Sequence, residues 1–290
     1  MIINEKNSSF QNANLLIWIW KYCTLWCKNN FNKPRGSMKI GFWRRLYEVC
    51  YTSLIGCALK LRYRVLVEGI ESINQNSQKG ALFLSNHVAE IDPVILEHVF
   101  WLKFHVRPIA VDYLFNNPVV KWFLDSVRAI PVPSVVPGRD DKRLLERIER
   151  FYVCVTQALD RKESLLLYPS GRLSRNGKEE IVNQQAAYTI LHRAKECDVF
   201  LVKITGLWGS SFSRYRTGST PKLGKVFKEA VKALLRCGIF FMPKREVRVS
   251  VCPADYSVLK QFPTKQEFNT FLSDWFNQEG GETPLEVPYA

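Results

Sequence analysis

The residues best suited to chemistry in this 290-residue chain lie between a predicted strand and a predicted helix. His87 and Asp92 stand five residues apart, after the apolar run Ala81–Leu84 and just before Pro93. Histidine is the side chain best suited to accept a proton near neutral pH. A nearby carboxylate can orient the ring and stabilise the imidazolium that forms. The pair therefore predicts a general base, and without an adjacent nucleophile the substrate would supply its own hydroxyl or amine.

The same residues also have a purely structural interpretation. Asp92 before Pro93 is a sufficient helix cap without any catalytic duty. A single histidine after a strand, such as His87, is often structural as well. The spacing alone leaves both interpretations open.

The pattern Asn86-His87-(four residues)-Asp92 after an apolar strand resembles the first motif of the glycerolipid acyltransferases. This family acylates glycerol-3-phosphate and lysophospholipids, and the resemblance implies that His87 is the general base and Asp92 its partner. Further segments resemble later motifs in the family's order: Ala129–Val132, Leu165–Arg172 and Phe200–Gly206. The resemblance extends roughly from Arg62 to Cys252, and it implies an acyl thioester, acyl-CoA or acyl-carrier protein, as co-substrate and no bound cofactor.

The chain departs from the family pattern at two positions. The third motif's glutamate, which helps bind the acceptor, is Ser170 here, and the second motif's phosphate-binding arginine is Ser134. Four basic residues could replace that arginine: Arg128, Arg139, Lys142 and Arg143.

The third motif still predicts where the acceptor binds. Arginine suits a phosphate through its bidentate fork, and a glycine permits close approach of the backbone. The predicted acceptor-binding residues are Ser170, Gly171, Arg172 and Arg175. The alternative for the two arginines is an ordinary solvated basic loop. The expected acceptor is a lysophospholipid or glycerol phosphate.

Two rival functions are compatible with these residues. A serine hydrolase would need a Gly-x-Ser-x-Gly elbow, and Tyr168–Arg172 does not form one. A catalytically degenerate family member that only binds lipid or membrane is favoured by Ser170. The presence of both His87 and Asp92 argues against it.

The composition predicts an anionic partner. The net charge is +14, and basic residues are interleaved with aromatic ones, as in Phe42–Tyr47. We find no zinc-finger, helix-turn-helix or RNA-binding signature, so a membrane surface is favoured over nucleic acid. The eight cysteines form no Cys-x-x-Cys pattern, which predicts a reducing compartment and no metal site.

The N-terminal third of the chain indicates attachment to a membrane. Residues 1–37 are expected to be an apolar extension and linker, including the tryptophan-rich run Leu15–Cys27. Residues 38–61 are predicted to hold an amphipathic helix over Phe42–Leu61, which either lies in the membrane interface or packs on the core. Residues 62–290 are predicted to be the acyltransferase domain. The expected location is the cytoplasmic face of a membrane.

The rest of the chain alternates between strand and helix patterns. Predicted strands cover 64–67, 81–84, 106–111, 129–132, 165–168, 199–205 and 246–252, and predicted helices lie between them and at 265–276. This alternation is typical of an α/β fold with a mostly parallel sheet flanked by helices. The expected fold therefore combines this sheet with N-terminal membrane-associated helices.

Overall fold

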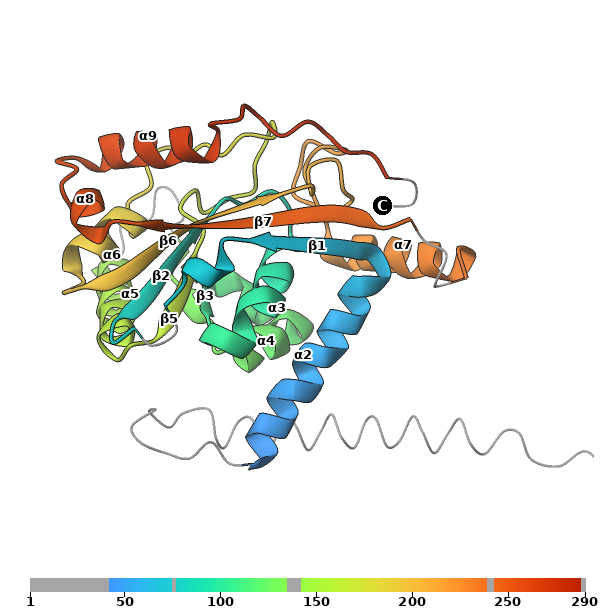
Figure 1. Ribbon diagram of the computed structural model, residues 1–290, viewed down its shortest axis with the longest axis horizontal. Helices are drawn as coiled ribbons and strands as arrows, with labels where there is room; N and C mark the ends of the chain where they lie inside the picture. Colours follow the sequence, from blue (N-terminus) through green and yellow to red (C-terminus); the bar gives the residue numbers. More distant parts are fainter. Residues whose placement is uncertain (1–41, 75–76, 135–141, 239–242, 288–290) are drawn as a thin grey trace, which may run out of the picture.

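The computed structural model describes residues 42–74, 77–134, 142–238 and 243–287 of the chain, and Figure 1 shows its arrangement. The predicted N-terminal extension and linker, residues 1–37, lie outside these described residues. A seven-stranded sheet has the order β1-β7-β6-β2-β5-β3-β4. Its strands are β1 Tyr63–Glu68, β2 Gly80–Ser85, β3 Arg107–Val111, β4 Ile130–Val132, β5 Ser164–Leu167, β6 Cys197–Thr205 and β7 Arg245–Ala254.

Helices cover both faces of the sheet, as the alternation predicts. They are α2 Phe42–Arg62, α3 Asp92–Phe104, α4 Pro118–Ser126, α5 Lys142–Asp160, α6 Ala186–Arg193, α7 Leu223–Arg236, α8 Tyr256–Lys260 and α9 Lys265–Phe276. In Figure 1, α9 lies above the sheet and α3 and α4 lie below it. Two short 3₁₀ helices, Ile70–Ser72 and Asp112–Asn116, complete the set.

The alternating side chains of the strands build a separate core on each face. Val199 and Leu201 of β6 join the core beneath α5, α6, α8 and α9. Phe200 and Val202 point the opposite way, into the core beneath α2 and α3. Because both faces are buried, the central strand β2 is apolar as far as Ser85 and contains no exposed residue.

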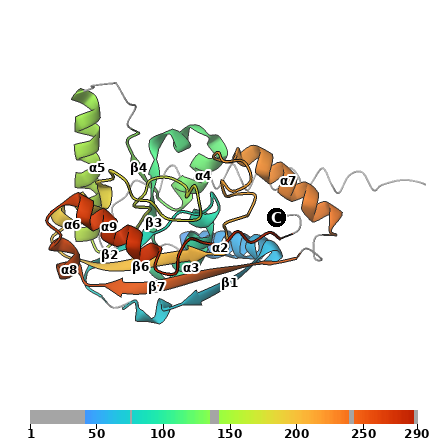
Figure 2. The same cartoon turned by 90° about the horizontal axis from the view of Figure 1, so that it is seen from above.

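The expectation of a mostly parallel α/β sheet is confirmed, with one antiparallel pair that the strand pattern did not reveal. Strands β6 and β7 run antiparallel, with Val199 opposite Ala254 and Thr205 opposite Arg248. The chain leaves β6 through a loop and α7, which lies at one end of the molecule in Figures 1 and 2. It therefore re-enters the sheet at the end where β6 finished. There Arg245 donates to the carbonyl of Gly206.

Helix α2 presents two different faces. Its inner face is packed, since Tyr51 and Leu59 are buried and Gly56 allows the His98 ring of α3 to approach closely. A methyl group on Gly56 would lie 2.5 Å from that ring. The outer face carries Val49 and Leu54, which are 49% and 69% exposed. One face of α2 therefore packs on the core, and membrane contact stays a prediction for the exposed face. Within the described residues, no helix is both long enough and apolar enough to cross a membrane.

Candidate active site

His87 lies just past the carboxyl end of β2, in the loop that leads to α3. Asn86 fixes the start of this loop, because its amide donates to the Ile204 carbonyl and accepts from the Ile204 N–H, both at 2.8 Å. The side-chain amide therefore extends the pairing of β2 with β6 by one residue. The carboxyl edge of a largely parallel sheet is where ligands usually bind in such folds.

Asp92 reaches back across the loop to His87. Its Oδ2 lies 3.1 Å from His87 Nδ1 and accepts the N–H groups of Val88 and Ala89 at 2.6 and 2.9 Å. The side chain is fully buried. One carboxylate oxygen thus fixes the histidine ring and the backbone beside it.

The expectation that Asp92 might serve as the cap of α3 is wrong. The residue at the N-cap position is Ile91, and Asp92 is the first helical residue, with Pro93 directly after it. No side chain caps this helix end. The aspartate carboxylate is directed to the loop that precedes the helix, because three donors gather there around one oxygen.

The electrostatic surroundings favour a charged ring at His87. Burial by itself lowers the pKa of His87. The hydrogen bond and charge of Asp92, aided by Glu90 and Glu179, outweigh this effect, so the pKa is raised above its ordinary value. Because Nδ1 faces Asp92, the opposite nitrogen, Nε2, is the one that can take a proton from a substrate.

The ring of His87 is also held by stacking. Tyr168, just after β5, stacks on it with ring centroids 4.2 Å apart and an angle of 25° between the planes. The histidine side chain is 16% exposed. Within the described part of the chain, Nε2 has no hydrogen-bond partner. The imidazole is therefore fixed through Nδ1, while Nε2 is left without a partner on a partly exposed ring, as a general base requires.

The second predicted loop lies directly beside the first. Ser174 donates its N–H to the His87 carbonyl at 2.7 Å, which joins the loop after β5 to the loop after β2. Gly171 has φ +61°, in the left-handed region, and its N–H closes a turn on the Tyr168 carbonyl at 3.0 Å. Glycine adopts this conformation without strain. The tertiary structure thus brings together the two motifs that the sequence separates by about eighty residues.

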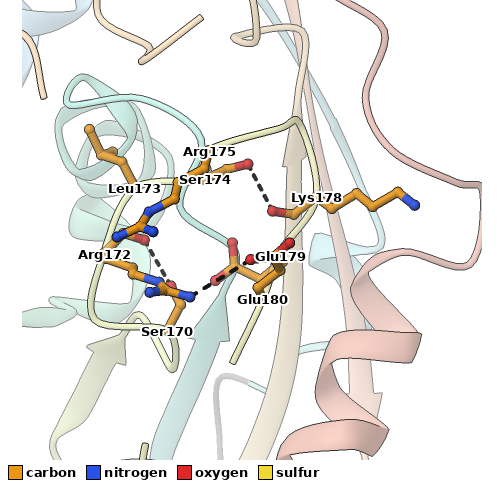
Figure 3. Close-up of a pocket in the computed structure, with 8 residues that line it drawn as sticks. All are labelled: Ser170, Arg172, Leu173, Ser174, Arg175, Lys178, Glu179 and Glu180. Atoms are coloured by element: carbon orange, nitrogen blue, oxygen red, sulfur yellow. Dashed lines mark hydrogen bonds and ion pairs between the residues drawn. The ribbon is translucent and has the colours of Figure 1, made fainter. Parts of the chain in front are cut away.

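Three of the four predicted acceptor-binding residues, Ser170, Arg172 and Arg175, line a small pocket shown in Figure 3, and Gly171 is not among its lining residues. Arg172 is 35% exposed and lies 3.8 Å from Glu180, and Arg175 is exposed. Ser170 is buried, and its hydroxyl donates to the Arg172 carbonyl at 2.9 Å. The hydroxyl is used within its own loop, which gives no support to a nucleophilic serine. Arg172, Arg175 and Lys178 are the cationic residues that line this pocket.

Arg128, one candidate for the missing phosphate-binding arginine, lies far from this edge. It precedes β4 and is 3.9 Å from Glu163, which precedes β5. Glu163 also pairs with Arg107 at the start of β3. These residues cluster at the amino ends of parallel strands, opposite the His87 loop. Arg139 lies outside the described residues, and Lys142 and Arg143 are exposed at the start of α5.

Two buried glutamates near the site escaped the sequence analysis. Glu179 accepts the His87 N–H at 3.0 Å, and burial raises its pKa to about 7. Glu97 of α3 is fully buried, and burial raises its pKa well above the usual range. Neither of its oxygens has a hydrogen-bond partner among the described residues. No local spacing marks either residue. Glu97 lies within an apolar helical segment, and a charged residue in such a segment is a sign of a buried charge.

A larger groove of about 520 Å³ lies along the edge strand β1, between α2 and α3. Its apolar lining comes from Leu59, Val65, Val67, Ile70 and Val99. Lys60, Arg64, Lys103 and Lys244 supply positive charge around it. Its size falls in the range of sites that hold small molecules. The described residues contain no cluster of His, Cys, Asp and Glu that could hold a metal ion.

Residues 64–210 match the acyltransferase family, over just more than half of the chain. The chain belongs to the acyltransferase family. The matched range contains His87, Asp92 and the four predicted acceptor-binding residues, and the family resemblance of the motifs is confirmed. Membership implies that this acyltransferase uses an acyl donor and an acceptor.

The fold of this acyltransferase is similar to that of a solved relative. The 1-acyl-sn-glycerophosphate (LPA) acyltransferase PlsC from Thermotoga maritima matches with a TM-score of 0.56 and 16% identity. The match covers 93% of this chain and 95% of that one. At this identity the likeness establishes the shared fold. No curated protein matches this acyltransferase in sequence.

Proposed function

We propose that this acyltransferase moves a fatty acyl group from an acyl thioester, acyl-CoA or acyl-carrier protein, to a hydroxyl of lysophosphatidate or another lysoglycerophospholipid. The observation that carries the proposal is the geometry of His87, whose Nδ1 faces a fully buried Asp92 while Nε2 has no partner among the described residues. His87 takes the proton from the acceptor hydroxyl as that oxygen attacks the thioester carbonyl. The thiolate then leaves and receives the proton.

The acceptor phosphate is proposed to bind at Arg172 and Arg175. Both residues line the small pocket beside the His87 loop, and Ser174 between them donates to the His87 carbonyl. A phosphate held there would place a neighbouring hydroxyl near the base. Among the described residues, Arg172 is paired with Glu180 alone, at 3.8 Å, so a doubly charged phosphate can displace that contact.

The groove along β1 is the proposed place for a fatty acyl chain. Its apolar lining suits methylene groups, and burial of each one contributes about 0.8 kcal/mol. The surrounding lysines and Arg64 suit the anionic groups that accompany such chains. The groove of about 520 Å³ shares no lining residue with the pocket at Arg172, so it is available for the acyl chain.

Arg172→Gln is expected to raise KM for a phosphorylated acceptor by about tenfold or more, while kcat changes little, because it removes one charge-assisted contact. Labelled products should be separated by thin-layer chromatography across lysophosphatidate, other lysophospholipids, glycerol-3-phosphate and monoacylglycerol. Lys121→Gln is the matched control, since Lys121 is a cation on α4 that pairs with Asp125. A strict preference of the unmodified protein for monoacylglycerol contradicts the proposed acceptor.

Membrane attachment on the cytoplasmic face is proposed to use the outer face of α2. Val49, Cys50, Leu54 and Cys57 are exposed along this face, while the opposite face packs against α3. Single exposed apolar residues are common, but four along one helix face form a stripe. A chain with net charge +14 gains further attraction to an anionic surface.

Leu54→Asp is expected to weaken binding to anionic liposomes at least severalfold, because it places a charge in the apolar stripe. Leu145→Asp is the matched control, since Leu145 is 70% exposed on α5 and α5 packs on the other face of the sheet. Cosedimentation with liposomes measures both. Equal binding by both variants and the unmodified protein would mean that this face does not meet the membrane.

A degenerate member that only binds lipid is the competing function, and Ser170 is its main support. The assembled His87–Asp92 pair argues against it, because a buried carboxylate is costly to keep where it performs no task.

A further inference from the structure

Glu179 contacts the backbone of the proposed base from outside the recognised motifs. Its side chain is buried, with 4% of the residue exposed, and its Oε2 accepts the His87 N–H at 3.0 Å. The Ser174 N–H donates to the His87 carbonyl at 2.7 Å. Both backbone polar groups of His87 are therefore bonded to the segment between Ser174 and Glu179.

Two carboxylates together hold the turn that carries His87. The His87 N–H donates to the Glu179 carboxylate, and the next two N–H groups, of Val88 and Ala89, donate to the Asp92 carboxylate. Successive N–H groups that converge in this way form an anion-binding nest. Asp92 fills one part of the nest from α3, and Glu179 fills the other part from the loop that carries the proposed phosphate-binding arginines.

Glu179 is itself held on both sides by one amide. Asn277, at the C-terminal end of α9, accepts the Glu179 N–H at 3.0 Å and donates to the Glu179 carbonyl at 2.9 Å. A chain of contacts thus runs from α9 through the Glu179 backbone to its carboxylate and on to His87. Side chains fixed by packing and hydrogen bonds in this way keep a reactive group within a few tenths of an ångström.

Ser170, where the third motif departs from the family pattern, lies beside Glu179. Both residues line the small pocket drawn in Figure 3. The Ser170 hydroxyl bonds to the Arg172 carbonyl but lies near enough to Glu179 to lower the pKa of that carboxyl, against the larger raising effect of burial. A carboxylate at either position would therefore reach nearly the same place.

We propose that Glu179 is the positioning residue for His87 and that its carboxylate lies beside position 170, nine residues upstream, where serine replaces the motif glutamate. This inference rests on the proposed acyl transfer by His87. Glu179 accepts a hydrogen bond from the His87 backbone, so it acts by fixing the turn from which the imidazole projects. Its loss should change kcat and leave acceptor KM nearly unchanged.

Glu179→Ala is expected to lower kcat by about 10- to 100-fold with acceptor KM within about threefold, since a displacement near 1 Å can cost about 100-fold. Glu179→Gln keeps an acceptor oxygen for the His87 N–H and should stay within about fivefold of the unmodified protein. Thermal unfolding of each variant reports folding. If Glu179→Ala does not fold, the glutamine variant and the double variant described next provide the test.

A double variant that moves the carboxylate from position 179 to position 170 distinguishes a positioning role of this group from a general effect on stability. Ser170→Glu combined with Glu179→Ala should recover at least tenfold of the kcat lost in Glu179→Ala. Glu282→Gln is the matched control, because Glu282 is another half-buried carboxylate that accepts two N–H groups, from Gly206 and Trp208, and has no hydrogen bond to His87 among the described residues. This control should keep its kcat within about twofold.

Each result has a distinct meaning. Wild-type kcat in a folded Glu179→Ala variant overturns the positioning role, as does a double variant that recovers nothing while the glutamine variant is as slow as alanine. Absence of acyl transfer from the unmodified protein to every acceptor tested instead overturns the proposed function and leaves the contacts of Glu179 in place.

Discussion

Replacing His87 with alanine is expected to reduce acyl transfer by about a hundredfold or more while the protein stays folded. The imidazole is proposed to deprotonate the acceptor hydroxyl, and a positioned general base contributes about 10²- to 10⁴-fold. The side chain is 16% exposed at the sheet edge, so its removal leaves the two cores intact. Initial rates with an acyl thioester and lysophosphatidate measure the effect.

His192→Ala is the control for the first variant. His192 lies on α6, on the far side of the structure from the His87 loop, and its Nδ1 lies 2.9 Å from the Tyr188 carbonyl. It should keep the rate of the unmodified protein. A folded His87→Ala variant with the same rate would exclude His87 as the base.

Asp92→Asn is expected to lower kcat by about 10²- to 10⁴-fold and to shift the pH dependence of the rate. Asparagine can place its oxygen where Asp92 Oδ2 accepts the Val88 and Ala89 N–H groups and faces Nδ1, but it carries no negative charge. The imidazolium that forms when Nε2 takes the proton then loses the charge that stabilises it. The measurement is the pH–rate profile of kcat/KM for both proteins.

The direction of this pH shift follows from the pKa of His87. Asp92 raises that pKa, so in the unmodified protein the neutral base forms only as pH rises above the ordinary value for histidine. Without the aspartate charge, burial dominates and lowers the pKa. The acid limb of the profile should therefore move to lower pH in Asp92→Asn. An unmoved acid limb would show that Asp92 does not tune His87.

Asp255→Asn provides the matched control for this substitution. Asp255 is a true helix cap, since its side chain accepts the Ser257 N–H at the start of α8 at 2.7 Å. Its replacement should cost at most about 1 kcal/mol of stability and leave the pH profile unchanged. The pair of variants thus distinguishes a capping aspartate from one that serves a histidine.

The local sequence was sufficient to predict most elements of the fold. Each of the seven strands and the longer helices coincides with a predicted segment, because apolar periodicity depends on neighbouring residues alone. Strand direction depends on the path between strands. The antiparallel pairing of β7 follows from the lateral course of α7, and no residue within β7 itself encodes it.

The candidate site was predicted only where its residues are close in sequence. His87 and Asp92 stand five residues apart and share a recognisable pattern, so the pair could be named before the structure was known. The sequence could not decide whether Asp92 caps α3 or faces His87. That choice depends on the backbone of Val88 and Ala89, which folds around the carboxylate.

The sequence by itself determined the strand–helix order, the His87–Asp92 pair and the basic loop around Arg172. Tertiary structure alone decided which side of α2 packs and which side stays exposed, because both sides are apolar enough for either role. It also decided the partner of the His87 backbone. Glu179 is ninety-two residues away, and only the joining of two loops at one sheet edge and the clamp by Asn277 bring its carboxylate there.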